Sequence, residues 1–459
     1  MALGNRRLGA ASSVPSVPTV LREVHNPGGE AFKMPPSPAF YPNLEVPPWS
    51  EEQEYEWRAL LKINPRTGKF QMFQCNAEYM LRNAPIYAGA IAFDWFSGEA
   101  IMLRPIPGGG QPGDPIQEEH LFAARAWGEE NLDVSFSISV LTAALRSVAL
   151  ANPRHKIRDW LMSQSWDGQP RLDMAHSTYF GAVDTDYNHA VVLRFMVGGV
   201  ARAMEPGCKL DTCLVLEGPQ GSFKSTSIQV LFMSPALVND TSLDLRSKDA
   251  FIGLQGMWAV EFSELESLSK VDASRVKAFF SSSSDKFRVP FGINLRKFPR
   301  SCVFVGTCNE SSYLQDTTGG RRFWPLRVGR IDLNALARDR EQLWAEAVAL
   351  YNAGEQWHLT YEEELLAREV QDGRRQEHPY EEPIAQFLAR RKDVTLGEVL
   401  AEAIGKKTWN TNSAEGRTVS QILTGVFGWR RGKVARPDGR VNGYAPPSTS
   451  NSDVVMDDD

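Results

Sequence analysis

Long uncharged apolar runs are missing from this sequence of 459 residues. The best candidate, residues 190–204, is interrupted by Arg194 and Arg202, so it lacks the roughly 18 uncharged apolar residues of a membrane span. Arg6 and Arg7 near the N-terminus are not followed by an apolar segment, which argues against a secretory signal. We therefore expect a cytoplasmic location and no membrane partner.

Cysteine and histidine are also scarce, and neither is spaced as metal ligands are. The cysteines are odd in number and lack zinc-ligand spacing, and the histidines form no HxxxH pair. The five cysteines are Cys75, Cys208, Cys213, Cys302 and Cys308. This composition predicts a protein of a reducing compartment without an evident metal site of its own.

An overall excess of basic charge is absent as well, because 50 Lys and Arg residues face 56 Asp and Glu residues and the net charge is −6. The exception is segment 286–330, which has nine basic residues against two acidic ones, Glu310 and Asp316. Its basic residues are Lys286, Arg288, Arg296, Lys297, Arg300, Arg321, Arg322, Arg327 and Arg330. Such a local excess suits a polyanion, either a nucleotide or a nucleic-acid backbone, and a solvated surface face is the alternative.

The distribution of proline, glycine and apolar residues divides the chain into six segments. Nine of the 28 prolines lie in the first 50 residues, a density that disfavours helix and predicts an extended, disordered tail. The predicted segments are this tail (1–50), a mixed α+β accessory domain (51–152), a helical lead-in or collar (153–207), a central region (208–360), a helical region ending in a hairpin (361–445) and an acidic disordered tail (446–459).

Four short apolar runs alternate with helical stretches in the central region. They are residues 213–216, 257–260, 302–305 and 323–328. Short apolar runs of this kind are typical of strands buried on both faces of a sheet. Their alternation with helices predicts an α/β core.

The strongest local motif follows the first of these runs and precedes a helical stretch. It reads Gly218-Pro219-Gln220-Gly221-Ser222-Phe223-Lys224-Ser225-Thr226. Glycines let several N–H groups face a polyphosphate, and the helix N-terminus favours its negative charge. Lys224 would reach the β- and γ-phosphates and Ser225 would bind Mg²⁺. Phe223 stands where the pattern has glycine, and a turn that binds no phosphate is the alternative interpretation.

Two carboxylates follow the second apolar run. Glu261 ends that run and Glu264 comes three residues later. A carboxylate at a strand end beside the loop can hold the magnesium shell, and a second can orient the attacking water. An adjacent Asp-Glu pair is absent, so the sequence leaves open how these roles divide, and a solvated acidic helix start is the alternative.

An amide and two arginines complete the candidate site. Asn309 follows the third apolar run, at the end of Gly306-Thr307-Cys308-Asn309. An amide there could contact the γ-phosphate or the water, although asparagine is also a common turn residue. Arg321 and Arg322 follow a glycine turn, and one of them could act as an arginine finger on a neighbouring subunit. A surface pair beside a packed Phe-Trp is the alternative.

Taken together, the motifs resemble those of the virulence-associated protein E family, which comprises P-loop ATPases of phages and mobile islands related to superfamily-three replicative helicases. The resemblance spans roughly residues 83–447 and rests on the order of the motifs more than on the loop alone. Its strongest parts are Gly218–Thr226, Glu261–Leu265, Asp285–Gly292, Phe298–Asn309 and Gly320–Pro325, with the lead-in His155–Arg158 and Trp166–Leu172 and the C-terminal Gly428–Tyr444.

This resemblance implies an AAA+/helicase-like P-loop domain at residues 208–360, with a mainly helical N-terminal region and a small winged-helix-like domain within 361–445. It places Lys224 and Ser225 in the Walker A motif and Glu261 or Glu264 in the Walker B motif. Asn309 becomes the sensor, and Arg321 or Arg322 the candidate finger. Arg288 falls in a family motif to which the residues assign no role.

The resemblance also implies ATP and Mg²⁺ as cofactors, DNA as partner and a homo-oligomeric ring, expected to be a hexamer, in a bacterial host cell. It leaves open whether a host or phage primase or polymerase is a further partner. Residues 1–152 lack an evident catalytic acid cluster, so we expect no primer synthesis by this chain alone.

Two rival functions use the same residues. An ATP-binding replication initiator or adaptor would bind DNA without unwinding it. A small-molecule P-loop kinase needs an acceptor site, which the sequence does not reveal. The favoured prediction is a Mg-ATP-dependent motor, a replicative helicase of a phage or mobile element.

Overall fold

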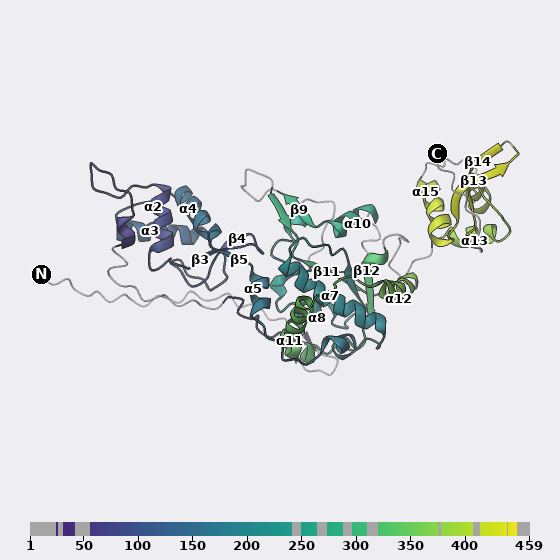
Figure 1. Ribbon diagram of the computed structural model, residues 1–459, viewed down its shortest axis with the longest axis horizontal. Coiled ribbons are helices and arrows are strands. Elements are labelled where there is room, and N and C mark those ends of the chain that lie inside the picture. The colour runs from purple at the N-terminus through teal and green to yellow at the C-terminus, as the bar shows by residue number, and fades with distance from the viewer. Residues whose placement is uncertain are drawn as a thin grey trace.

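The computed structural model describes residues 24–25, 31–41, 56–240, 249–263, 273–287, 296–309, 320–374, 378–406, 414–437 and 439–447. Figure 1 shows these residues as three groups of elements that follow one another along the chain. Among them no helix is both long and apolar enough to cross a membrane.

The first group combines helices with a small sheet. Its elements are α2 (Gln74–Asn83), β3 (Ile91–Asp94), β4 (Glu99–Met102), α3 (Glu118–Leu132), α4 (Ile138–Leu150) and β5 (Pro153–Arg154). The strand order is β4-β3-β5, antiparallel between β3 and β4 and parallel between β3 and β5. Buried side chains of α2, α4 and β3 form one apolar core. The described part of residues 51–152 therefore contains both helices and strands.

Part of the proline-rich N-terminal segment packs against the rest of the chain. Phe32 and Tyr41 are buried, and the ring of Phe40 lies 6.0 Å from that of Trp160. Arg340 donates a hydrogen bond to the carbonyl oxygen of Pro36 at 3.1 Å. Within the tail expected over residues 1–50, the described residues 31–41 thus contain the strand β2 (Ala31–Phe32) and no helix, and two of their aromatic side chains are buried.

The second group is built on a five-stranded parallel sheet. In spatial order its strands are β12 (Phe323–Arg327), β6 (Cys213–Glu217), β11 (Val303–Cys308), β8 (Ala259–Phe262) and β7 (Val238–Asn239). The four apolar runs of the sequence correspond to β6, β8, β11 and β12. Because the sheet is parallel throughout, the carboxyl ends of all five strands meet at one edge.

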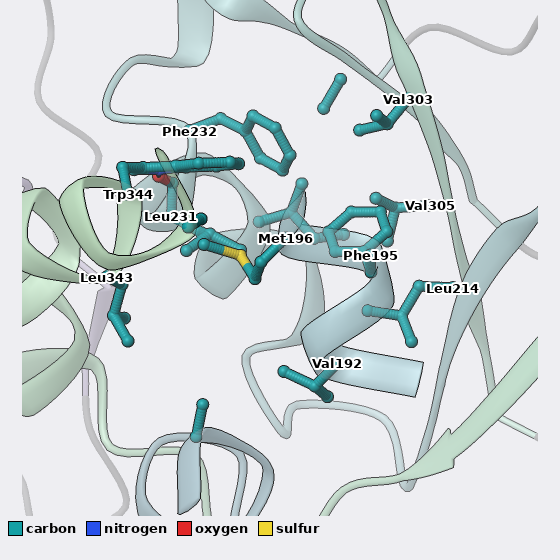
Figure 2. Close-up of a cluster of buried hydrophobic side chains, with 14 of the residues drawn as sticks. Val192, Phe195, Met196, Leu214, Leu231, Phe232, Val303, Val305, Leu343 and Trp344 are labelled. Carbon is teal, nitrogen blue, oxygen red and sulfur yellow. The ribbon is translucent and has the colours of Figure 1, made fainter. Parts of the chain in front are cut away.

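Helices cover both faces of this sheet. On one face lie α7 (Asp186–Met204), α8 (Lys224–Leu231) and α11 (Leu333–Asn352), whose side chains join β6 and β11 in the largest core. Figure 2 shows part of it, with Phe195, Phe232 and Trp344 pointing toward one another. The rings of Trp344 and Trp258 are 4.3 Å apart. On the other face α10 (Ala273–Ser281) contributes Phe279 and Phe280 to a second core.

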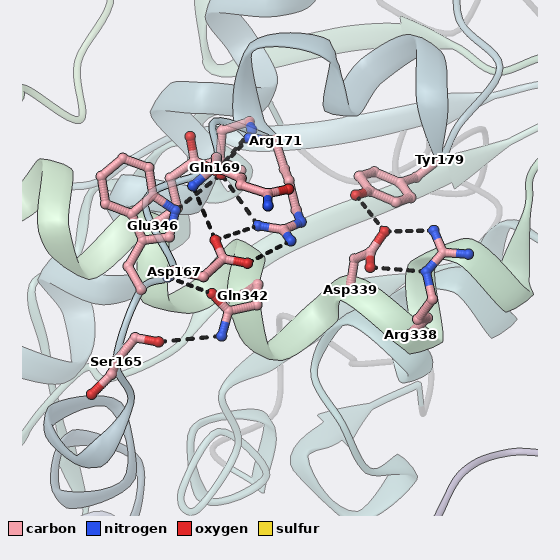
Figure 3. Close-up of polar contacts among 11 residues, drawn as sticks. Ser165, Asp167, Gln169, Arg171, Tyr179, Arg338, Asp339, Gln342 and Glu346 are labelled. Atoms are coloured by element: carbon pink, nitrogen blue, oxygen red, sulfur yellow. Dashed lines mark hydrogen bonds and ion pairs between the residues drawn. The ribbon is translucent and has the colours of Figure 1, made fainter.

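Residues 166–172, in the lead-in to the sheet, contact α11 through polar side chains (Figure 3). Arg171 makes two hydrogen bonds of 2.8 Å to the carboxylate of Asp167. The backbone N–H groups of Arg171 and Leu172 donate to Glu346 at 2.7 and 3.0 Å. Residues 166–172, prominent in the sequence, therefore join the lead-in to the central unit and do not line the nucleotide site.

Two further elements extend from the central unit. The hairpin of β9 (Ser284–Phe287) and β10 (Arg296–Pro299) precedes β11. The helix α12 (Tyr361–Asp372) contacts α7 and β12. Packing therefore groups α12 with the sheet, beyond the boundary expected at residue 360.

The third group has a separate apolar core. Its elements are α13 (Glu381–Leu388), α14 (Leu396–Glu398), α15 (Ala414–Gln421) and the antiparallel hairpin of β13 (Arg430–Arg436) and β14 (Gly439–Ala445). π-helical turns at Val399–Ala403 and Ile422–Val426 continue α14 and α15. Ile384, Val399, Val419 and Tyr444 are among the buried members of the core. The hairpin expected after residue 429 is present.

Candidate nucleotide-binding site

The loop Gly218–Phe223 connects β6 to the first turn of α8. Gly221 has a φ of +82°, which glycine adopts without strain. Phe223 has φ 62° and ψ 24°, also in the left-handed region, at a cost of ~1 kcal/mol or more for a side chain of this kind. The position thus retains the backbone conformation for which the motif normally uses glycine, and partial packing of Phe223 against the main core accompanies it.

Lys224 is buried, with 8% of its surface exposed, and its ammonium group lies inside the loop. It donates hydrogen bonds to the carbonyl oxygens of Gly218 and Pro219 at 2.7 and 2.9 Å. It also contacts the hydroxyl of Ser222 at 3.3 Å and the amide oxygen of Asn309 at 3.2 Å. Oxygens of the protein therefore surround the ammonium group that, according to the motif, would bind the phosphates.

Ser225 and Glu261 meet at the carboxyl edge of the sheet. The Ser225 hydroxyl donates to Oε1 of Glu261 at 2.5 Å, and the Thr307 hydroxyl donates to the same oxygen at 3.0 Å. The other oxygen, Oε2, is buried without a hydrogen-bond partner among the described residues. Burial raises the pKa of Glu261, more than these hydrogen bonds lower it.

This pair suits a magnesium ion. Mg²⁺ prefers oxygen ligands and is usually held by one or two carboxylates together with phosphates and water. A serine hydroxyl beside a carboxylate whose second oxygen is buried and unpartnered fits that preference. In the described part of the chain, no group of three or more His, Cys, Asp or Glu side chains could hold a metal ion by itself.

Asp240 is an acid near this site that the sequence did not single out. It follows β7, and the parallel pairing of Asn239 with Val260 places Asp240 beside Glu261. Its charge contributes to the raised pKa of Glu261. The strand β7 has only two residues, too few to show a periodic pattern. Thr307, inside β11, was likewise missed because threonine in an apolar run is no chemical signal.

Asn309 lies where the sequence expected it, immediately after β11, and the structure brings it to Lys224. The parallel register between β11 and β6 places both side chains at the carboxyl edge. Glu264, the second candidate carboxylate, lies outside the described residues, as does Arg288. The division of roles between Glu261 and Glu264 therefore stays open.

Arg321 and Arg322 lie at the opposite edge of the sheet from the loop. They precede β12, whose first residue pairs with Cys213, whereas the loop follows Glu217 at the other end of β6. Arg322 donates to the Ser281 hydroxyl at 3.0 Å and forms an ion pair with Asp211 at 3.4 Å. Neither arginine shares an edge with Lys224, so neither is positioned to act on a phosphate in the loop of its own subunit.

The basic segment expected to form one patch is divided among several places. Arg300 is buried, donates two hydrogen bonds of 2.7 Å to Asp285 and stacks over Phe279. Lys286 and Lys297 are exposed and face each other across the β9–β10 hairpin. The excess of positive charge in segment 286–330 is therefore partly neutralised inside the protein. The positive charge exposed on the hairpin is smaller than the excess counted along the sequence.

A buried ion pair stands directly before the loop. Glu217, the last residue of β6, is 3% exposed. Arg374, just after α12, donates to both of its carboxylate oxygens at 3.0 to 3.2 Å. No local pattern indicates this pair, because its members are 157 positions apart.

Comparison with known proteins supports the P-loop assignment. Residues 161–376 match the family described as the virulence-associated protein E-like domain, which confirms the prediction from the motifs, and P-loop families of this kind bind nucleotides. No curated protein matches the chain.

Solved structures that are similar include two of the apo NrS-1 C-terminal region, residues 305–718. Both are 10% identical to this chain, with TM-scores of 0.44 and 0.46, and the similarity covers 78% of this chain and 96% of theirs. At these scores the fold assignment rests on the sheet, the loop and the family match.

Proposed function

Because residues 161–376 match the virulence-associated protein E-like domain, we propose that this protein is a Mg-ATP-dependent ATPase that acts on DNA. Its working form would be a homo-oligomeric ring, most simply a hexamer, that unwinds DNA during replication of a phage or mobile element. The observation that supports hydrolysis best is the meeting of Lys224, Ser225, Glu261 and Asn309 at one edge of a parallel sheet.

Each of these residues has a definite task in the proposal. The ammonium group of Lys224 exchanges its internal oxygens for the β- and γ-phosphates of ATP. Ser225 and Glu261 would hold Mg²⁺, which when bound neutralises charge on the phosphates. Asn309 contacts the γ-phosphate or the attacking water. Catalysis is then mainly positioning and charge stabilisation by groups that are already in place.

The two arginines fit a site shared between subunits. Because Arg321 and Arg322 lie at the amino edge of the sheet, they could reach only the nucleotide of a neighbouring copy. An arginine supplied in this way stabilises the charge that develops on the transferred phosphoryl group. Hydrolysis would then depend on assembly.

The β9–β10 hairpin is the proposed contact with the DNA strand inside the ring. Lys286 and Lys297 are direct cross-strand partners and both are exposed. Like charges opposite each other destabilise a hairpin, and a polyanion bound there would neutralise them. In the sequence, the hairpin comes between β8, which carries Glu261, and β11, which is followed by Asn309. It can therefore respond to the state of the nucleotide through these two strands.

The first experiment measures ATP hydrolysis with and without single-stranded DNA, with Lys224→Ala as the control. Stimulation by DNA that the variant abolishes would support the motor. Strand displacement on a forked duplex then distinguishes a helicase from an adaptor, since an ATP-binding adaptor would bind the fork without separating it. Unaltered DNA-stimulated hydrolysis by Lys224→Ala would contradict the proposal.

A mixing experiment tests the shared site. Lys224→Ala and Arg322→Ala subunits are each expected to be inactive alone. In mixed rings, some interfaces combine the intact loop of one variant with the intact arginine of the other. Hydrolysis well above the sum of the separate variants would support action between subunits, and its absence with Arg321→Ala as well would contradict it.

A further inference from the structure

The C-terminal unit contains a groove that the ATPase chemistry does not use. It has a volume of about 1050 Å³ and lies between the start of α14, one face of α15 and the β13–β14 hairpin. Among the described residues, its lining includes three cationic side chains, Arg417, Arg431 and Lys433, and no Asp or Glu. All three are exposed. A groove of this composition favours an anionic ligand.

The cations of this unit differ in whether an acidic side chain neutralises them. Arg436, at the end of β13, forms ion pairs with Glu398 and Asp393 at 2.6 and 2.5 Å. Within the described part of the chain, none of the three groove cations has an ion pair with an acid. Their charge is therefore directed toward whatever enters the groove.

One of the cations is held in position by the floor of the groove. Arg431 donates to the Ser420 hydroxyl at 2.5 Å, and Tyr444 donates to the same oxygen at 2.8 Å. The guanidinium group also lies over the Tyr444 ring, 6.0 Å from its centroid. Ser420 and Tyr444 are 5% and 6% exposed. This arrangement orients Arg431 before any ligand arrives, which lowers the entropic cost of binding.

The wall of the groove admits close approach of a bulky ligand. A Cβ placed on Gly432 would meet no atom within 4 Å, so the backbone of β13 is open there. By contrast, Gly443 is required by packing, because a Cβ would lie 2.5 Å from Val434. Backbone that is open beside three cations suits a ligand whose charge is distributed along a chain.

The aromatic content of the groove indicates which polyanion it takes. Single-stranded nucleic acids are usually bound by exposed aromatic rings on which bases stack. Among the described residues, Tyr444 is the one aromatic side chain that lines this groove, and it is almost fully buried. The described lining therefore offers contacts to phosphates and no exposed ring on which a base could stack.

We propose that the groove formed by α15 and the β13–β14 hairpin binds the phosphate backbone of duplex DNA. This inference rests on the proposed function in that DNA is the partner, and it adds a second contact, separate from the β9–β10 hairpin and specific for the duplex form. It holds the unwound fork's duplex arm while the ATPase acts on the strand.

The test uses the full chain with the double substitution Arg417→Gln and Lys433→Gln. Binding to a fluorescent duplex and to the corresponding single strand is measured by anisotropy, without nucleotide, over a range of salt concentrations. We expect at least ~10-fold weaker duplex binding and a slope of log K against log salt that is smaller by about 2, one unit for each phosphate that the variant no longer neutralises. Single-strand binding and DNA-independent ATP hydrolysis should not change.

Two further variants keep the result interpretable. Arg390→Gln with Lys392→Gln removes the same charge from exposed positions of the same unit outside the groove, and should leave duplex affinity unchanged. Gly432→Glu keeps all three cations and introduces a repelling carboxylate where there is room for it, and should weaken duplex binding. Circular dichroism establishes that each variant is folded.

The outcomes separate this inference from the function on which it rests. Three outcomes would overturn the groove assignment, even if DNA-stimulated hydrolysis is observed. They are an equal loss of duplex affinity in the control pair, a loss of single-strand affinity as large as that of duplex affinity, and unchanged duplex affinity in both groove variants. Polyglutamate is also tested as a competitor for the bound duplex, at the same charge concentration as competitor DNA. If it displaces the duplex as effectively as DNA does, the choice of DNA as the ligand is overturned. Selective loss of duplex binding supports the groove even if the protein proves to be an adaptor without motor activity.

Discussion

Two cationic regions of the molecule, the loop around Lys224 and the groove around Arg417, treat positive charge differently. Lys224 is buried and surrounded by oxygens of its own loop and of Asn309. Arg417 and Lys433 are exposed and have no ion pair with an acid in the described residues. The first arrangement fixes one charge at one point, and the second leaves several charges for a ligand of extended shape.

This contrast shows that the count of basic residues along a sequence predicts little about where a polyanion binds. Segment 286–330 has nine basic residues against two acidic ones, yet one of its arginines, Arg300, is neutralised in a buried pair with Asp285. The C-terminal hairpin is less conspicuous in sequence. Burial and pairing, which depend on the fold, decide which charges remain for a ligand.

The largest effect expected is that of Lys224→Ala on hydrolysis. The variant lacks one preorganised positive charge that would face the negative charge developing on the phosphates. Its loss should lower kcat by ~10²–10³-fold. Duplex affinity without nucleotide should not change, because the groove belongs to a separate unit. Steady-state hydrolysis and anisotropy on the same preparation check both statements, and a parallel loss of DNA binding would break the comparison.

The second effect concerns stability at the pair before the loop. Arg374→Ala leaves Glu217 charged and buried, which should lower the free energy of unfolding by about 3 kcal/mol. The matched change Arg436→Ala, at the more exposed pair with Glu398, should cost clearly less. Denaturant unfolding measures both, and Arg374→Ala combined with Glu217→Gln should recover part of the loss. Equal costs for the two arginines would contradict the distinction between buried and exposed pairs.

A third prediction uses two carboxylates whose pKa values move in opposite directions. Burial raises the pKa of Glu261, so its ionisation disfavours the folded state and stability from this group is lost as pH rises above ~4.5. Hydrogen bonding to Arg436 lowers the pKa of Glu398 to about 2, so its contribution is present above the unfolded pKa and is lost as pH falls toward 2.

Thermal unfolding between acid and neutral pH tests this contrast. Glu261→Gln should unfold at a higher temperature than the wild type at pH 7 without Mg²⁺, and the advantage should vanish at acid pH. Glu398→Gln should be less stable than the wild type at pH 7, with the deficit vanishing in strong acid. The same sign for both variants at pH 7 would be inconsistent with the two environments.

The smallest effect is expected at Phe223. Its left-handed backbone penalises alanine but not glycine, so Phe223→Gly should be more stable than Phe223→Ala by ~1 kcal/mol. Both variants lose the same packing against the main core, which makes the pair a matched comparison. Denaturant unfolding measures the difference, and an advantage for alanine would show that the loop changes conformation when the ring is removed.

The sheet and the placement of several candidate site residues at its carboxyl edge were predictable because their signals are local. The motif from Gly218 to Thr226, Glu261 and Asn309 each follow an apolar run, and those runs became β6, β8 and β11. A strand buried on both faces has a continuous apolar pattern, so the carboxyl edge could be identified from sequence. The helices and the terminal hairpin followed from periodicity and turn residues.

The rest depends on spatial order, which no local pattern contains. The position of Arg322 at the far edge follows from the pairing of β12 with β6, and the pair of Glu217 with Arg374 joins distant segments. Asp240 was missed because β7 is too short to be recognised. At Phe223 the sequence departs from the glycine of the motif, yet the backbone there adopts the glycine-like conformation where the loop turns into α8.

The oxygens around Lys224 have a consequence for how nucleotide affinity should be understood. In the conformation described, the loop already supplies acceptors for the ammonium group, so under the proposed function ATP would compete with the protein itself for that group. The measured dissociation constant is then the intrinsic one divided by the fraction of molecules whose lysine is released. A change that loosens this internal competition, such as Asn309→Ala, could tighten binding while it slows turnover, so a gain in affinity would here signal damage to the enzyme.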